Sequence, residues 1–255
     1  SWESLYFHSS RPSSIKIAIE PYTYHKINSK AWFSHIEAEL SKHPNIHFLA
    51  AEINSVGFQG LGTIVQTSEG EYYASEKIFD SFSPFPCDNA NPKHLKQHFL
   101  GWEVECNFNN FEVDAAHLFD FRVAFGTECE FMYVLPTSPK KALFEYTFFS
   151  GKIRNKNYYR DKLKAYLLAY YGFGEDDYDL LEEEYGVIPM RPIEENAQNL
   201  HAKLIKIGTS GGFVKSTTGY SFLRTQRTLK ELVANLETKN HKAFVLKEFR
   251  FKKWM

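Results

Sequence analysis

The sequence predicts a mixed α/β protein with two parts, one built on an antiparallel sheet and one on a strand–turn–helix pattern. The first observation is a series of four apolar, alternating segments between residues 96 and 150, separated by turn residues. The second is an amphipathic helical pattern over 157–171 that ends at Gly172 and Gly174. The third is a short apolar strand at 204–207, followed by glycines and a helical pattern that runs to about Leu236.

Composition excludes several function classes. The chain has 255 residues, with 30 basic and 31 acidic side chains and a formal charge of −1. Because the two kinds of charge nearly cancel, the chain has no net positive charge that would favour binding of nucleic acid or of an acidic ligand. Aromatic residues make up 16% of the chain, with 23 Phe and 15 Tyr. This content suits either a bulky core or a pocket for a long hydrocarbon ligand.

Cysteine and histidine spacing gives no sign of a disulfide framework or a metal site. Cys87, Cys106 and Cys129 form no CxxC pair, and the odd count favours a reducing, cytoplasmic compartment. The ten histidines are scattered without an HExxH pattern, so we expect no metal ligands. No apolar run approaches the ~18–20 residues of a membrane-spanning helix, so any membrane contact is expected to be peripheral.

The elements follow one another in three blocks. Residues 1–95 are expected to form one block, with strands and turns at 1–30, a helix near 31–44 and a three-stranded meander that includes a hairpin at 62–73. Residues 96–200 are expected to form an antiparallel sheet that floors a substrate cavity. Residues 201–255 are expected to return to the first block. The four strands predicted in the middle block are 97–106, 116–125, 129–137 and 142–150.

The segment ALFEYTFFS places one carboxylate, Glu145, inside an otherwise apolar strand. An isolated ionised carboxylate there would lose its hydration, so the group must be paired, hydrogen-bonded or protonated. One interpretation is a structural ion pair or a strand-end acid that reaches water. The other is a carboxylic acid with a raised pKa, held beside an apolar substrate as a proton donor.

The second informative segment is the glycine turn after the strand at 204–207. Gly208, Gly211 and Gly212 are followed by a Ser/Thr run and a helix start, an arrangement that suits an anion. The spacing matches neither GxGxxG nor a P-loop, so it does not establish a nucleotide phosphate site. A plain turn capped by Ser or Thr is the alternative.

Three segments in series resemble the lycopene cyclases, the flavoproteins that close the ends of linear carotenes. The first is QHFLGWEVE (97–105) with FEVDAAHLFDFRV (111–123). The second is FMYVLPTSPKKALFEYTFFS (131–150). The third is EYGVIPM (184–190) with IGTSGGFVKSTTGYSF (207–222). The likeness extends over most of the chain, from about residue 20 to 236.

The resemblance implies a fold of the α+β two-domain flavoprotein type, with a partial FAD-binding domain in residues 1–95 and 201–255 and an antiparallel-sheet substrate domain in 96–200. By position it implies Glu145 as the catalytic acid, with Asp120 and Arg122 in a D-F-R element and Glu112 in an F-D/E element. It implies that the turn contacts FAD through Gly208, Gly211, Gly212, Lys215, Thr218 and Gly219. FAD reduced by NAD(P)H is the expected cofactor.

The sequence departs from the family pattern in two places. Ser216 stands where the family has proline, and no strand–GxGxxG–helix precedes the matched segments. Because the chain also begins in the middle of a pattern, we expect it to be a fragment of a longer protein.

The function implied is acid-initiated cyclisation of lycopene to a β-ring, an isomerase-type reaction at a peripheral membrane surface. Two rivals remain at this stage. One is a flavin-dependent monooxygenase or prenyl-chain reductase of the same architecture. The other is a non-catalytic carrier of apolar ligands.

Overall fold

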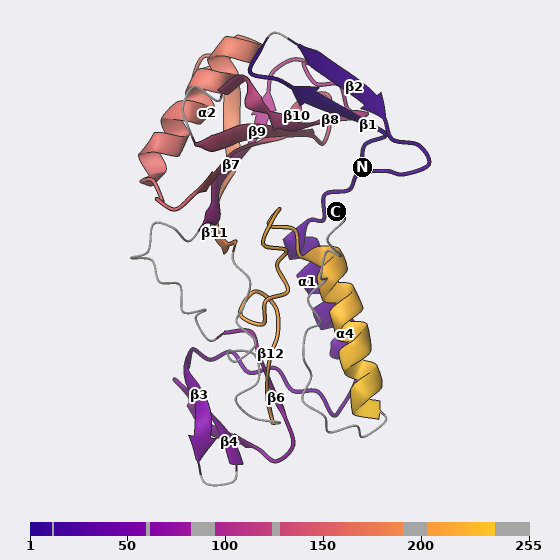
Figure 1. Ribbon diagram of the computed structural model, residues 1–255, viewed down its shortest axis with the longest axis vertical. Helices are drawn as coiled ribbons and strands as arrows, with labels where there is room; N and C mark the ends of the chain where they lie inside the picture. Colours follow the sequence, from indigo (N-terminus) through magenta and orange to yellow (C-terminus); the bar gives the residue numbers. More distant parts are fainter. Residues whose placement is uncertain (12, 60–61, 83–94, 124–127, 191–202, 238–255) are drawn as a thin grey trace, which may run out of the picture. The chain divides into compact units, whose positions relative to one another are not determined.

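The computed structural model describes residues 1–11, 13–59, 62–82, 95–123, 128–190 and 203–237 (Figure 1). The chain divides into two compact units, one of residues 1–47 and 91–188 and the other of residues 48–90 and 189–255. The first unit contains β1 (Ser4–His8), β2 (Ser14–Ala18), α1 (Ser29–Leu40), β7 (Lys96–Cys106), β8 (Ala115–Asp120), the short 3₁₀ helix η1 (Phe121–Val123), β9 (Cys129–Pro136), β10 (Lys141–Ser150), α2 (Lys156–Tyr171) and β11 (Tyr178–Pro189). The second contains β3 (Ile53–Gln59), β4 (Gly62–Thr67), β5 (Gly70–Ala74), β6 (Ile78–Asp80), β12 (Leu204–Lys206) and α4 (Phe222–Glu237).

The first unit is organised around a seven-stranded sheet in the order β11-β7-β10-β9-β8-β1-β2. Strand β10 lies between β7 and β9 and pairs antiparallel with both. Strand β1 pairs parallel with β8 and antiparallel with β2. The long hairpin-connected strands β9 and β10 meet because the turn at Pro136–Lys141 closes them in register.

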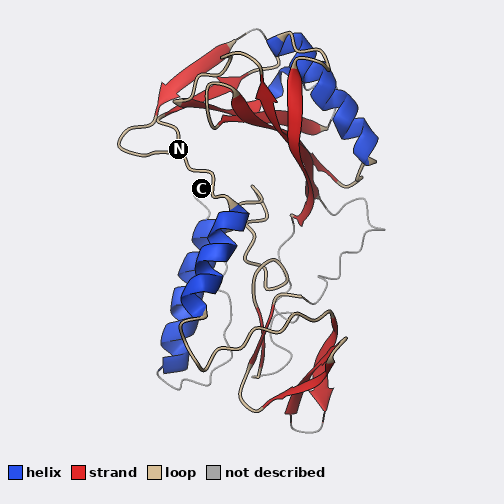
Figure 2. Ribbon diagram, turned by 180° about the vertical axis from the view of Figure 1, so that it is seen from behind, coloured by secondary structure: helices blue, strands red, loops and turns tan. Residues whose placement is uncertain are grey.

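Helix α2 covers one face of this sheet, as the two ribbon views show (Figure 2). The even-numbered residues of β10 face the helix, and Phe144, Tyr146 and Phe148 pack there against Tyr159, Leu163, Tyr166 and Leu167 of α2. The odd-numbered residues of β10 lie on the opposite face, where Leu143 packs with Phe131 and Tyr133 of β9. Because both faces of the central strands carry apolar side chains, β10 reads as a nearly continuous apolar run.

Helix α2 begins and ends where its sequence predicts. The Asn155 side chain accepts a hydrogen bond from the Tyr158 backbone N–H at 3.0 Å and caps the first turn. At the other end, Gly172 has a φ of 71°, the left-handed conformation that ends many helices. A buried contact fixes the helix to the sheet, because the Tyr159 hydroxyl lies 2.6 Å from Nδ1 of His98 on β7.

A β-bulge in β8 changes which residues face the helix. His117 and Asp120 pair with Val134 and Met132 of β9, so β8 carries one extra residue between them. Phe119 sits at this point with a φ of 55° and packs on the face away from α2. The extra residue turns Asp120 towards the α2 face.

The second unit contains the meander β3–β4–β5 and a short parallel pair of β12 with β6. Lys206 of β12 forms a 2.8 Å ion pair with the buried Asp80 of β6. The glycine turn follows β12, and α4 begins at Phe222. The hairpin predicted at 62–73 is confirmed as β4 and β5.

The mixed α/β class expected from the sequence is confirmed, and so are three of the four strands of the middle block and the helix that follows them. The strand predicted at 116–125 ends at Asp120, where the 3₁₀ helix η1 begins, and residues 124–127 lie outside the described residues. The structure differs from the expected grouping at the N-terminus. Residues 4–18 form β1 and β2 at the edge of the large sheet, beside β8, and thus lie in the same unit as the sheet. Cys106 and Cys129 are free thiols, while Cys87 lies outside the described residues.

Candidate active site

Glu145 occupies the middle of β10, near the centre of the large sheet. Its cross-strand partners are Gly101 on β7 and Tyr133 on β9. Its side chain lies on the face away from α2, together with Leu143, Thr147 and Phe149 of the same strand, since alternate residues of a strand share a face. The side chain is half-buried.

The carboxyl group of Glu145 has one direct protein partner among the described side chains. The Thr147 hydroxyl donates a 2.9 Å hydrogen bond to Oε1. Burial raises the pKa of Glu145 to about 7, against the lowering effect of the Thr147 hydrogen bond, with a further rise from the charge of Glu184 and a counteracting effect of Lys26. A carboxylic acid in this setting keeps its proton close to neutral pH.

Aromatic rings surround this position on the same face of the sheet. Phe131 packs edge-to-face on Tyr133, with centroids 5.1 Å apart, and on Phe149, with centroids 5.3 Å apart. Phe119 and Phe121 extend the cluster towards η1. Ring faces carry partial negative charge, so such a surface suits a hydrocarbon that acquires positive charge.

Asp120 and Arg122 lie on the opposite face from Glu145. The Arg122 guanidinium donates to both carboxylate oxygens of the fully buried Asp120, and its Nε lies 2.9 Å from Oδ1. Tyr166 of α2 donates its hydroxyl to Oδ2 of Asp120 at 2.6 Å, and the ring of Tyr170 lies 4.1 Å from the Arg122 guanidinium carbon. Burial alone would raise the pKa of Asp120, but these hydrogen bonds hold it below its usual value. The D-F-R element therefore ties β8 to α2.

Glu112 is also separate from Glu145. Its carboxylate pairs with Lys16 of β2 and accepts a 3.1 Å hydrogen bond from the hydroxyl of Tyr6 on β1. The ion pair is exposed and holds the pKa of Glu112 below its ordinary value. Of the four residues predicted to be catalytic, the structure thus places only Glu145 on the apolar face away from α2.

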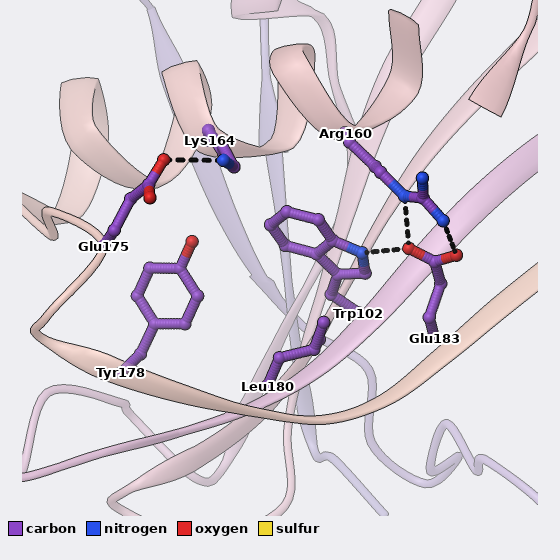
Figure 3. Close-up of a pocket in the computed structure, with 7 residues that line it drawn as sticks. All are labelled: Trp102, Arg160, Lys164, Glu175, Tyr178, Leu180 and Glu183. Atoms are coloured by element: carbon purple, nitrogen blue, oxygen red, sulfur yellow. Dashed lines mark hydrogen bonds and ion pairs between the residues drawn. The ribbon is translucent and has the colours of Figure 1, made fainter. Parts of the chain in front are cut away.

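A shallow hollow of about 380 Å³ lies on the α2 side of the sheet (Figure 3). Glu183 of β11 accepts hydrogen bonds there from Arg160 Nε at 2.8 Å and Trp102 Nε1 at 3.0 Å. Lys164 pairs with Glu175 at 2.6 Å on the other rim, beside Tyr178. These charges are paired with one another, and the Trp102 indole forms the floor. We therefore interpret the hollow as a packed edge of the sheet.

The residues predicted to bind the cofactor lie together in the turn between β12 and α4. Gly208, Gly212 and Gly219 have φ values of 62°, 77° and 74°, which favour glycine. At Gly211 a Cβ would lie 2.5 Å from the Lys206 carbonyl oxygen, so packing within the turn itself requires this glycine. The Lys215 side chain is exposed, and its backbone N–H and carbonyl brace the loop through bonds with Tyr220 and Gly219.

These residues fit one part of an FAD molecule. A strand, a glycine turn with an exposed lysine, Ser and Thr hydroxyls, and a helix start together offer donors to the carbonyl and nitrogen edge of an isoalloxazine ring. The pyrophosphate requires a GxGxxG turn, which this sequence does not contain.

Comparison with solved structures places the fold in a known class. A geranylgeranyl bacteriochlorophyll reductase-like protein from Thermoplasma acidophilum matches with a TM-score of 0.67 and 10% identity, over 94% of this chain and 63% of that one. The flavin-dependent brominase Bmp2 matches with a TM-score of 0.64 and 10% identity, over 95% of this chain and 63% of that one. The halogenase PltM matches with a TM-score of 0.62 and 14% identity, over 96% of this chain and 54% of that one. The chain spans between half and two-thirds of their lengths, and its fold is one that flavin-dependent enzymes use.

Within this class, the sequence profile of the lycopene cyclase protein family matches residues 1–253. The chain belongs to the lycopene cyclase family. No curated protein matched the sequence. Among the described residues, no helix is both long and apolar enough to cross a bilayer, and no group of three or more His, Cys, Asp or Glu side chains is placed to hold a metal ion.

Sequence reasoning missed three neighbours of Glu145. Thr147 is two residues away, so strand alternation could have placed it beside the acid. Gly101 stands inside a predicted strand, where an isolated glycine often marks a close approach. Glu184 stands in a run of three glutamates, a pattern typical of a solvated face, and only pairing between distant strands brings it near Glu145.

Proposed function

We propose that this chain carries the catalytic acid of a lycopene cyclase, which closes the linear end group of lycopene to a β-ring. The observation that carries the proposal is the position of Glu145, a carboxylic acid with its pKa raised to about 7 on an apolar face of the sheet. Family membership supports the substrate class.

The chemistry needs an acid that is still protonated when the substrate arrives. The Glu145 carboxyl would give its proton to the terminal alkene, which leaves a tertiary carbocation. The neighbouring alkene attacks this cation and closes the ring, and loss of a proton from the ring gives the product without net oxidation or reduction. Burial favours the neutral acid, and an apolar wall limits capture of the cation by water.

The aromatic cluster on the same face supplies the second requirement. Phe131, Tyr133 and Phe149 form an edge-to-face aromatic cluster on the same face of the sheet as Glu145. A cation within about 6 Å of a ring face is stabilised by ~0.5–2 kcal/mol, with the larger value where water is excluded. Thr147 holds the Glu145 carboxyl in place through its hydroxyl group.

FAD is the cofactor that the family and the turn residues favour. Gly208, Gly212, Lys215, Thr218 and Gly219 would hold the isoalloxazine end, with Gly211 shaping the turn. When reduced by NAD(P)H and bound, FAD would supply negative charge to a site in which a carbocation forms. Because lycopene dissolves in lipid, we propose that the protein meets its substrate at a membrane surface.

The proposal is tested by assaying the intact protein with lycopene and less than one equivalent of reductant per substrate. A cyclase converts the substrate completely to an isomer of unchanged mass, whereas a monooxygenase or prenyl-chain reductase consumes one equivalent per product. Because the active form of Glu145 is protonated, the rate should be highest below pH 7 and fall as the pH rises through about 7. A product of changed mass, or reductant consumption that matches product, would contradict the proposal.

A further inference from the structure

Glu184 lies in line with Glu145 across three strands of the sheet. Two contacts fix how β11 pairs with β7: Trp102 binds Glu183 on the α2 face, and the ring of Phe99 covers Gly186 on the other. Residue numbers rise along one strand as they fall along the other, so the two strands are antiparallel. From these two contacts we infer that Glu184 is opposite Gly101, which is the partner of Glu145 on β10.

Gly101 places no side chain of β7 between the two carboxyl groups, and Leu143 and the stem of Glu145 fill the space above it. Glu184 lies on the same face of the sheet as Glu145. Its neighbour Glu183 points to the α2 side, and successive residues of a strand point to opposite faces. A Cβ at position 101 would contact Leu143 Cδ1 at 3.2 Å and the Cβ and Cγ of Glu145 at 3.6 Å. No side chain on β7 therefore separates the acid from Glu184.

The other polar groups that face Glu145 come from four elements. Thr147 of β10 donates its hydrogen bond, and Tyr133 of β9 is the cross-strand partner. Glu103 of β7 is two residues beyond Gly101, and its carboxylate pairs with Lys26 at 3.4 Å. The Lys26 charge is therefore partly balanced by Glu103. Glu184 of β11 is solvent-exposed and acts on Glu145 through its charge.

We propose that Glu184 is a positioning residue of this site, whose negative charge acts across Gly101, where β7 has no side chain, to hold the proton on Glu145. The inference rests on the proposed function, because it concerns the acid of the cyclisation. In this role, Glu184 sets the pH range in which Glu145 acts as the acid. The negative charge of Glu184 raises the pKa of Glu145, in agreement with this geometry.

The test compares two matched variants, Glu184→Gln and Glu182→Gln. Both remove one exposed carboxylate from the same face of β11. Position 182, however, lies two residues further along the strand from the position opposite Gly101. We expect Glu184→Gln to move the alkaline limb of the pH–rate profile down by about half to one pH unit, the size of one charge acting over two strand spacings. Glu182→Gln should move it much less.

A second readout does not depend on turnover. The Glu145 carboxyl, labelled with ¹³C and followed by NMR in the protein without substrate, should titrate at lower pH in Glu184→Gln by the same amount. Equal profiles for the two variants, or an unshifted titration in Glu184→Gln, would overturn the role of Glu184.

The outcomes also separate this inference from the proposed function. If lycopene is not cyclised but the Glu145 titration shifts in Glu184→Gln, the coupling stands and the cyclase assignment fails. If lycopene is cyclised and the titration does not shift, the assignment stands and the inference fails.

Discussion

Replacing Glu145 by glutamine should lower the rate of lycopene cyclisation by about 10²–10⁴-fold, the contribution typical of a general acid. Glutamine keeps the size of the side chain and its acceptor oxygen for the Thr147 hydroxyl, but it has no proton to give. The loss should appear in kcat, because the acid acts in the transition state and contributes little to binding a hydrocarbon. The measurement is the initial rate of product formation by the intact protein at pH 6.

The matched control is Glu105→Gln on β7. Glu105 lies on the same face of the sheet, is partly exposed and pairs with Lys141 at 3.0 Å near the end of the strand. This variant should retain the parental rate and pH profile. Parental activity in Glu145→Gln would remove Glu145 from its assigned role, and equal losses in both variants would indicate a general effect on the sheet.

Replacing Asp120 by asparagine should lower the free energy of unfolding by about 3–5 kcal/mol, because it leaves the Arg122 charge without its buried partner. The carboxylate is fully buried and accepts hydrogen bonds from both Arg122 and Tyr166. Since its pKa is held below the usual value, the pair stabilises the fold at neutral pH, and this contribution is lost as the pH falls through the folded-state pKa. Urea unfolding at pH 7 and at a pH well below the ordinary aspartate pKa of about 3.9 measures both effects.

Glu112→Gln serves as the control, because the Lys16–Glu112 pair is exposed and should change stability little. The prediction also separates a structural role from a catalytic one. An Asp120→Asn protein with parental stability and no activity would mean that Asp120 takes part in the chemistry, against its position on the α2 face.

The sequence predicted the elements of the large sheet well because their patterns are local. Strand alternation placed Glu145 among apolar residues, and Gly172 ended α2 as expected. The pairing of β1 with β8 was not predicted, since it joins residues more than a hundred positions apart. No local pattern encodes such a contact.

The candidate site was predicted only in part, and the bulge at Phe119 explains why. The family motif groups Asp120 and Arg122 with Glu145, but a single extra residue in β8 turns Asp120 to the other face. Phenylalanine gives no warning of a positive φ, so the sequence shows no sign of the bulge. The position of Glu184 likewise depends on the register of β11 against β7, which non-local pairing fixes.

The pKa of Glu145 tests the central claim most directly. The carboxyl carbon can be labelled with ¹³C and assigned as the glutamate signal that disappears in Glu145→Gln, and its shift can then be followed from pH 3 to 9. A neutral acid poised on an apolar face predicts a midpoint near 7. A midpoint at the ordinary glutamate value of about 4.3 would mean that the group is ionised at neutral pH and is not the proton donor.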